Sequence, residues 1–114
     1  MAKSPVIDVN VEDFDELVIE QSHSRIVVID LWADWCPPCL GLDPVLKKIV
    51  SEYDGQVVLA KIEVDEGDNM KIAGRYNVRG FPTVILFRNG EEQDRFSSMQ
   101  SPVFVRDFID RHIG

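Results

Sequence analysis

The chain reads IVVIDLW at residues 26–32 and ADWCPPC at residues 33–39. The first run is apolar and β-branched without alternation, apart from Asp30, which is typical of a strand buried on both faces. The second run ends in Cys36 and Cys39, separated by two prolines. We expect a helix from Cys36 to Tyr53, kinked by Pro44. The cysteine pair therefore falls where a buried strand gives way to a helix.

The flanking sequence predicts further elements. Towards the N-terminus, Asn10 caps a helix from Val11 to about Ser22, with Asp13 completing a capping box. Towards the C-terminus we expect a strand over 56–64, a helix over 68–76, strands over 83–88 and 91–96, and a helix from Ser101-Pro102 to His112, with Gly114 beyond it. Asn89-Gly90 predicts the turn between the last two strands.

The resulting order is βαβαβαββα. Alternation of strands and helices predicts parallel pairing in the first half, and the closing hairpin makes the sheet mixed. The predicted fold class is α/β, with a central mixed sheet flanked by helices. At 114 residues, we expect a single domain over residues 1–114.

Composition narrows the possible partners. Hydrophobic residues make up 45% of the chain and the formal net charge is −8. This acidic balance argues against nucleic acid or an anionic membrane as a partner. No apolar run is long enough to cross a bilayer. Residues 1–8 do not resemble a secretory leader, so we expect a cytoplasmic protein, in which two cysteines are rarely a structural staple.

The position of each cysteine predicts its chemistry. Cys36 is expected at the helix N-terminus, where unpaired N–H groups and the helix dipole favour a thiolate. The thiolate is the nucleophile, so Cys36 is expected to attack a substrate disulfide. Cys39, one turn further in and better shielded, is expected to resolve the mixed disulfide.

Other interpretations of the pair are weaker. Zinc needs about four ligands, and the only histidines, His23 and His112, are far away in sequence and are expected at the surface. A haem attachment site needs histidine after the second cysteine, where this chain has Leu40. An iron–sulfur cluster would need two chains. A chance pair of structural thiols remains open, and the acidic residues at 63–68 lack the spacing of a calcium loop.

The two prolines suggest a reducing pair. Neither offers an N–H to the Cys36 sulfur, whereas a glycine at position 37 would add one donor. We therefore expect a less stabilised thiolate than in strongly oxidising proteins, and a reduction potential in the reducing range.

Several motifs together resemble the thioredoxin family over nearly the whole chain. They are Trp32-Ala33-Asp34-Trp35-Cys36-Pro37-Pro38-Cys39, Pro44, Arg79-Gly80-Phe81-Pro82-Thr83, Asp30, Lys61, Asp65 and Phe87-Arg88-Asn89-Gly90. The resemblance implies the thioredoxin fold and a protein-disulfide reductase. We expect no bound cofactor, because the electrons pass through the protein's own cysteines, and we expect a monomer without a metal. The family resemblance also implies disulfide-containing client proteins as substrates and an NADPH-dependent, flavin-containing thioredoxin reductase as electron donor.

The resemblance also implies roles for particular residues. Pro82 is expected to follow a cis peptide bond and face the cysteine pair, although a trans proline opening a strand is the simpler interpretation of the sequence alone. The Phe81 backbone is then expected to pair with an incoming peptide. The expected substrate-binding residues are Trp35, Pro37, Pro38, Gly80, Phe81 and Pro82. Trp32 is expected to pack against the core.

Asp30 is an acid within an apolar strand. It is either solvated at an edge or buried with a raised pKa. By resemblance it lies beneath Cys39 and relays that residue's proton, with Lys61 as its charge partner.

One departure from the family pattern concerns the client groove. Ser98 stands where thioredoxins usually carry a glycine lining that groove, so the choice of client is expected to differ. The altered groove motivates one rival function, a binding protein or chaperone that captures clients transiently. A second rival, an oxidant or isomerase, would be revealed by a less negative potential.

Overall fold

The computed structural model describes residues 5–113. Its strands are β1 (Val6–Asp8), β2 (Ile26–Trp32), β3 (Val57–Glu63), β4 (Thr83–Arg88) and β5 (Glu91–Ser97), and its α-helices are α1 (Pro37–Ser51), α2 (Met70–Arg75) and α3 (Pro102–Asp110). The five strands form one sheet in the order β1-β3-β2-β4-β5. The pairs β1–β3 and β2–β3 are parallel, whereas β2–β4 and β4–β5 are antiparallel. The predicted mixed α/β fold is confirmed.

Two of the sequence-based predictions concern residues at the chain ends that the structure does not describe. Residues 1–4, used in the expectation about a leader, and Gly114, expected beyond the last helix, are not described. Within residues 5–113, no helix has both the length and the apolar character needed to cross a membrane.

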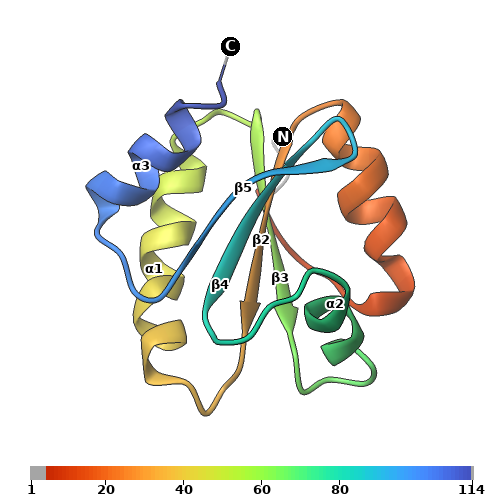
Figure 1. The fold of residues 1–114 in the computed structure, drawn as a ribbon. Coiled ribbons are helices and arrows are strands. Elements are labelled where there is room, and N and C mark those ends of the chain that lie inside the picture. Colours follow the sequence, from red (N-terminus) through yellow and green to blue (C-terminus); the bar gives the residue numbers. More distant parts are fainter. Residues whose placement is uncertain (1–4, 114) are drawn as a thin grey trace.

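Helices cover both faces of the sheet. Figure 1 shows α1 and α3 on one face, and α2 with the N-terminal helical segment, residues 11–23, on the other. Side chains of β2 alternate between the two cores: Val27 and Ile29 belong to one, and Ile26 and Val28 to the other. The prediction that β2 is buried on both faces is therefore confirmed.

The N-terminal helical segment differs from the prediction. We expected an α-helix from Val11 to about Ser22, but the segment is a 3₁₀ turn (Val11–Asp13), a π-helical stretch (Asp15–Glu20) and a second 3₁₀ turn (Gln21–His23). Side chains compete for its carbonyl groups: the Gln21 amide donates to the Leu17 carbonyl and the Ser22 hydroxyl to that of Ile19. Such local bonds offer the backbone alternatives to regular α-helical geometry.

The turn and cap predictions at the C-terminal half are confirmed. Asn89 and Gly90 have φ values of 57° and 81°, the left-handed pair that a type I′ hairpin turn requires. The Ser101 hydroxyl accepts the Phe104 N–H at 3.1 Å, and Pro102 opens α3. The helix ends at Asp110, two residues before the expected His112, while α2 is also shorter than expected and begins at Met70.

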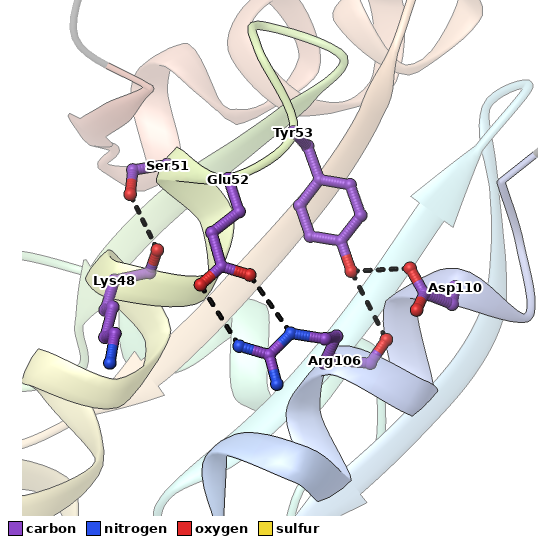
Figure 2. Close-up of polar contacts among 6 residues, drawn as sticks. All are labelled: Lys48, Ser51, Glu52, Tyr53, Arg106 and Asp110. Atoms are coloured by element: carbon purple, nitrogen blue, oxygen red, sulfur yellow. Dashed lines mark hydrogen bonds and ion pairs between the residues drawn. The ribbon is translucent and has the colours of Figure 1, made fainter.

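Polar contacts join the C-terminal end of α1 to α3. Glu52 accepts two hydrogen bonds from the Arg106 guanidinium, and the Tyr53 hydroxyl donates to Asp110 at 2.7 Å (Figure 2). His112, expected at the surface, is instead half-buried, with its Nε2 2.9 Å from Asp94. The long-range fold brings these residues together, which local sequence does not reveal.

Candidate active site

The cysteine pair lies where the sequence predicted it. Cys36 is the N-cap of α1 and Cys39 lies in the first turn, with a Cα–Cα distance of 5.3 Å and a disulfide joining them. The Cys39 backbone N–H donates to Cys36 Sγ at 3.3 Å. Because Pro37 and Pro38 have no N–H, Cys39 supplies the first backbone donor of the helix. This one donor would stabilise a Cys36 thiolate after reduction.

A loop containing a cis proline lies against this pair. The Phe81–Pro82 peptide bond is cis, as expected, and the Phe81 carbonyl oxygen is 3.6 Å from Cys36 Sγ. The Thr83 hydroxyl donates to the Gly80 carbonyl at 2.7 Å. Backbone immediately before β4 is therefore held beside the disulfide.

Exposed apolar side chains surround the cysteines. Trp35 is 61% exposed, its indole N–H donates to Asp65 at 2.5 Å, and its ring meets Phe81 edge to face at a centroid distance of 6.2 Å. Leu40 and Met99 are 52% and 47% exposed. The Trp35 and Phe81 rings thus form an apolar edge beside Cys36.

Sequence reasoning missed the contact between Gly41 and Met99. A Cβ atom on Gly41 would lie 3.2 Å from Met99 Sδ, so the glycine allows the methionine to approach α1 closely. The neighbouring residue Ser98 contacts the cis-proline loop. Its N–H donates to the Pro82 carbonyl at 3.0 Å, and its φ is 66°. A left-handed φ is a conformation that glycine adopts without steric cost, whereas serine does not.

Asp30 is buried on the face of β2 that alternation gives to α1. It is 1% exposed, and its Oδ1 has no hydrogen-bond partner among the described residues. Burial raises the pKa of Asp30 from 3.8 to about 7, opposed by the positive charge of Lys61. The buried alternative for Asp30, rather than the solvated one, is therefore the observed one.

Lys61 is placed beside Asp30 but bonds elsewhere. The two residues are register partners in the parallel β2–β3 pair, yet the Lys61 ammonium donates to Asp43 of α1. It also lies over the Trp32 ring, 4.4 Å from the centroid. Lys61 therefore acts on Asp30 through its charge. Among the described residues, Asp30 Oδ1 accepts no hydrogen bond from the Lys61 ammonium. Trp32 packs against the core, as expected.

Asp43 is the charged residue that sequence reasoning missed. Although burial acts to raise it, hydrogen bonds from Lys61 and Lys47 hold the pKa of Asp43 below its ordinary value. A signal was present in the sequence, because Asp43 follows Cys39 by one helical turn and precedes Lys47 by another. Its link to Lys61 of β3 depends on how the helix packs on the sheet.

These features define a class of protein. A helix N-terminus that carries a disulfide across two intervening residues, faced by a cis-proline loop, is built for thiol–disulfide exchange. The fold and the site are those of a thiol–disulfide oxidoreductase.

Comparison with known proteins identifies the family. The thioredoxin family model matches residues 5–111. A thioredoxin of Chlorobaculum thiosulfatiphilum is 37% identical over 90 residues, covering 79% of this chain and 82% of its own. A thioredoxin of Staphylococcus epidermidis is 33% identical over 108 residues, covering 95% and 98%. The chain belongs to the thioredoxin family and is a protein thiol–disulfide oxidoreductase that reduces disulfides by dithiol–disulfide exchange.

Proposed function

We propose that Cys36 is the nucleophile, Cys39 the resolving cysteine and Asp30 the proton acceptor in this exchange, with Lys61 modulating Asp30. The Cys39 N–H bond to Cys36 Sγ at the start of α1 is the observation that supports it most strongly. It provides a donor that favours a thiolate at Cys36 over one at Cys39.

The proposed reaction proceeds in two exchanges. The Cys36 thiolate attacks one sulfur of a client disulfide, forming a mixed disulfide and releasing the other client sulfur as a thiolate. Cys39 then loses its proton to the Asp30 carboxylate and attacks Cys36 Sγ. The second client sulfur leaves as a thiolate, and the two electrons of the dithiol have passed to the client. An acid with a pKa of about 7 can both accept and release a proton near neutrality.

Clients would bind over Trp35, Pro37, Pro38, Gly80, Phe81 and Pro82. The exposed Trp35 ring and the cis-proline loop beside Cys36 support this assignment. We further propose a cytoplasmic monomer that is returned to the dithiol by a thioredoxin reductase. The electrons reside in the cysteines themselves, so the proposal requires no bound cofactor.

The cysteine roles are tested by single substitutions. With thioredoxin reductase, NADPH and a disulfide-bonded client protein, Cys36→Ser should abolish NADPH consumption. Cys39→Ser should instead accumulate a mixed disulfide with the client, visible by non-reducing electrophoresis. Accumulation by Cys36→Ser, and none by Cys39→Ser, would reverse the assigned roles.

The direction of the reaction is tested by the reduction potential. Equilibration in defined thiol–disulfide buffers, followed by tryptophan fluorescence, should give one two-electron transition near roughly −270 mV. A transition above roughly −200 mV would favour an oxidant or isomerase instead.

A further inference from the structure

Asp43 joins two lysines that come from different elements. Its Oδ1 accepts from Lys61 of β3, and its Oδ2 is 2.9 Å from the ammonium of Lys47, one turn further along α1. The side chain of Lys61 is only 11% exposed and that of Asp43 23%. The Asp43–Lys61 pair is therefore shielded from solvent and screened less than a surface ion pair.

The Asp43–Lys61 pair engages Lys61, the cation that is the register partner of Asp30 in the sheet. Asp30 and Lys61 are opposite one another in the β2–β3 register, and alternation places both on the face covered by α1. Nevertheless Lys61 donates to Asp43, while Asp30 Oδ1 has no hydrogen-bond partner among the described residues. An ammonium group held by one carboxylate stabilises a second carboxylate less.

We infer that Asp43 is a positioning residue that holds Lys61 away from Asp30 and so sets the pH above which Asp30 can accept the proton of Cys39. The kinetic part of this inference rests on the proposed role of Asp30. Asp43 itself is assigned no contact with the client or the reacting sulfurs.

The charges around Asp30 agree with the geometry. Burial is the largest influence and raises its pKa to about 7; Lys61 lowers it, Asp43 raises it and Lys47 lowers it. On the other side of β2, the register neighbour of Asp30 is the apolar Val84 of β4. In the reduced protein α1 contributes one further titratable group, Cys39. Removing the Asp43 charge and releasing Lys61 both favour the ionised form of Asp30.

The experiment follows the titration of Asp30 itself in the oxidised protein, where the cysteines do not titrate. Carboxyl ¹³C NMR gives the midpoint, and Asp30→Asn identifies the signal. Asp43→Asn should lower the Asp30 midpoint by roughly one pH unit, while Asp43→Glu, which keeps the charge, should leave it near the wild-type position. Asp68→Asn is the matched control, because it removes an equal charge from an exposed ion pair with Lys71.

A second substitution tests whether Asp43 acts on Asp30 through Lys61. Lys61→Met should raise the Asp30 midpoint, and Asp43→Asn should lower the midpoint less in the Lys61→Met background than in the wild type. An Asp30 midpoint that is unchanged or raised in Asp43→Asn overturns the inference. So does a fall of equal size in Asp68→Asn.

Kinetics separate this inference from the proposed function. The rate at which Cys39 resolves a mixed disulfide with a small aromatic thiol is measured against pH. In Asp43→Asn the acid limb of this profile should move to lower pH together with the NMR midpoint. If Asp30→Asn leaves the profile unchanged, the proton relay is rejected, while the NMR result still decides whether Asp43 controls Asp30.

Discussion

Asp30 places a carboxyl group in the apolar interior between β2 and α1, and this has a consequence for stability. Its pKa is raised from 3.8 to about 7, chiefly by burial. Well below pH 3.8 the group is protonated in both the folded and unfolded states. As the pH rises towards 7, the unfolded chain releases the proton while the folded protein retains it, so folding becomes less favourable. Above pH 7 the cost is constant.

We therefore expect Asp30→Asn to stabilise the oxidised protein at pH 8 and to have little effect near pH 4. The shift in pKa corresponds to an upper limit of roughly 4 kcal/mol, at about 1.36 kcal/mol per pKa unit. Denaturant unfolding of both proteins at the two pH values measures the difference. An equal difference at pH 4 and pH 8 would contradict the assignment of the cost to ionisation.

Ser98 adopts a backbone conformation that favours glycine, with φ at 66°. A side chain in this region costs about 1–2 kcal/mol, partly recovered here by the 2.5 Å hydrogen bond from the Ser98 hydroxyl to the Ser97 carbonyl. Ser98→Gly should raise the free energy of unfolding by roughly 1 kcal/mol. Ser98→Ala, which keeps the Cβ and loses the hydrogen bond, should not, and an increase of the same size in both variants would argue against backbone strain.

Asn69 joins elements that are distant in sequence. It is buried just before α2, and its Nδ2 donates to the Asn10 side chain and to the Glu63 carbonyl, both at 2.9 Å. Its Oδ1 accepts the Val11 N–H at 2.7 Å. One side chain therefore holds the start of the N-terminal helical segment against the end of β3.

Loss of this amide should loosen the N-terminal helical segment before the rest of the molecule. Asn69→Ala leaves the Val11 N–H without its partner and removes one of two donors from the Glu63 carbonyl, which still accepts the Glu66 N–H. The substitution should cost roughly 1–3 kcal/mol. Amide exchange at Val11 should accelerate much more than exchange in β2. Asn10→Ala is the control, since it removes one of the three bonds, and it should have the smaller effect. Similar protection of Val11 in both variants would show that Asn69 does not hold the segment.

The charge of the whole molecule should affect its choice of client. The net charge is −8, and the exposed Asp34 and Asp65 lie next to or in contact with Trp35. Such a field accelerates the approach of positively charged partners and is screened by salt. A disulfide peptide flanked by lysines should be reduced faster at low than at high ionic strength.

The control is a peptide of equal length flanked by glutamates, whose reduction should become faster as salt is added. Stopped-flow tryptophan fluorescence at two salt concentrations gives the second-order rate constants. Rate constants with the same salt dependence for both peptides would show that charge does not steer clients to Cys36.

Much of this molecule follows from local rules that can be applied to sequence. The unbroken apolar run predicts β2 as a strand buried on both faces, and Asn-Gly predicts the β4–β5 turn, since only certain residues tolerate its left-handed angles. Ser101-Pro102 likewise predicts the start of α3. The Cys36–Cys39 spacing before a helix predicts the disulfide and its chemistry. The cis bond at Pro82 needed the family resemblance as well.

The sequence by itself determined the order of elements, the two faces of the central strands, and the cysteine pair at a helix N-terminus. Each depends on periodicity, caps or turn angles within a few residues. Tertiary structure alone decided that Lys61 bonds to Asp43 and that Asn69 reaches Val11. A charged or polar side chain chooses among all partners within reach, and packing of α1 on the sheet brings Asp43 to Lys61, a partner distant in sequence.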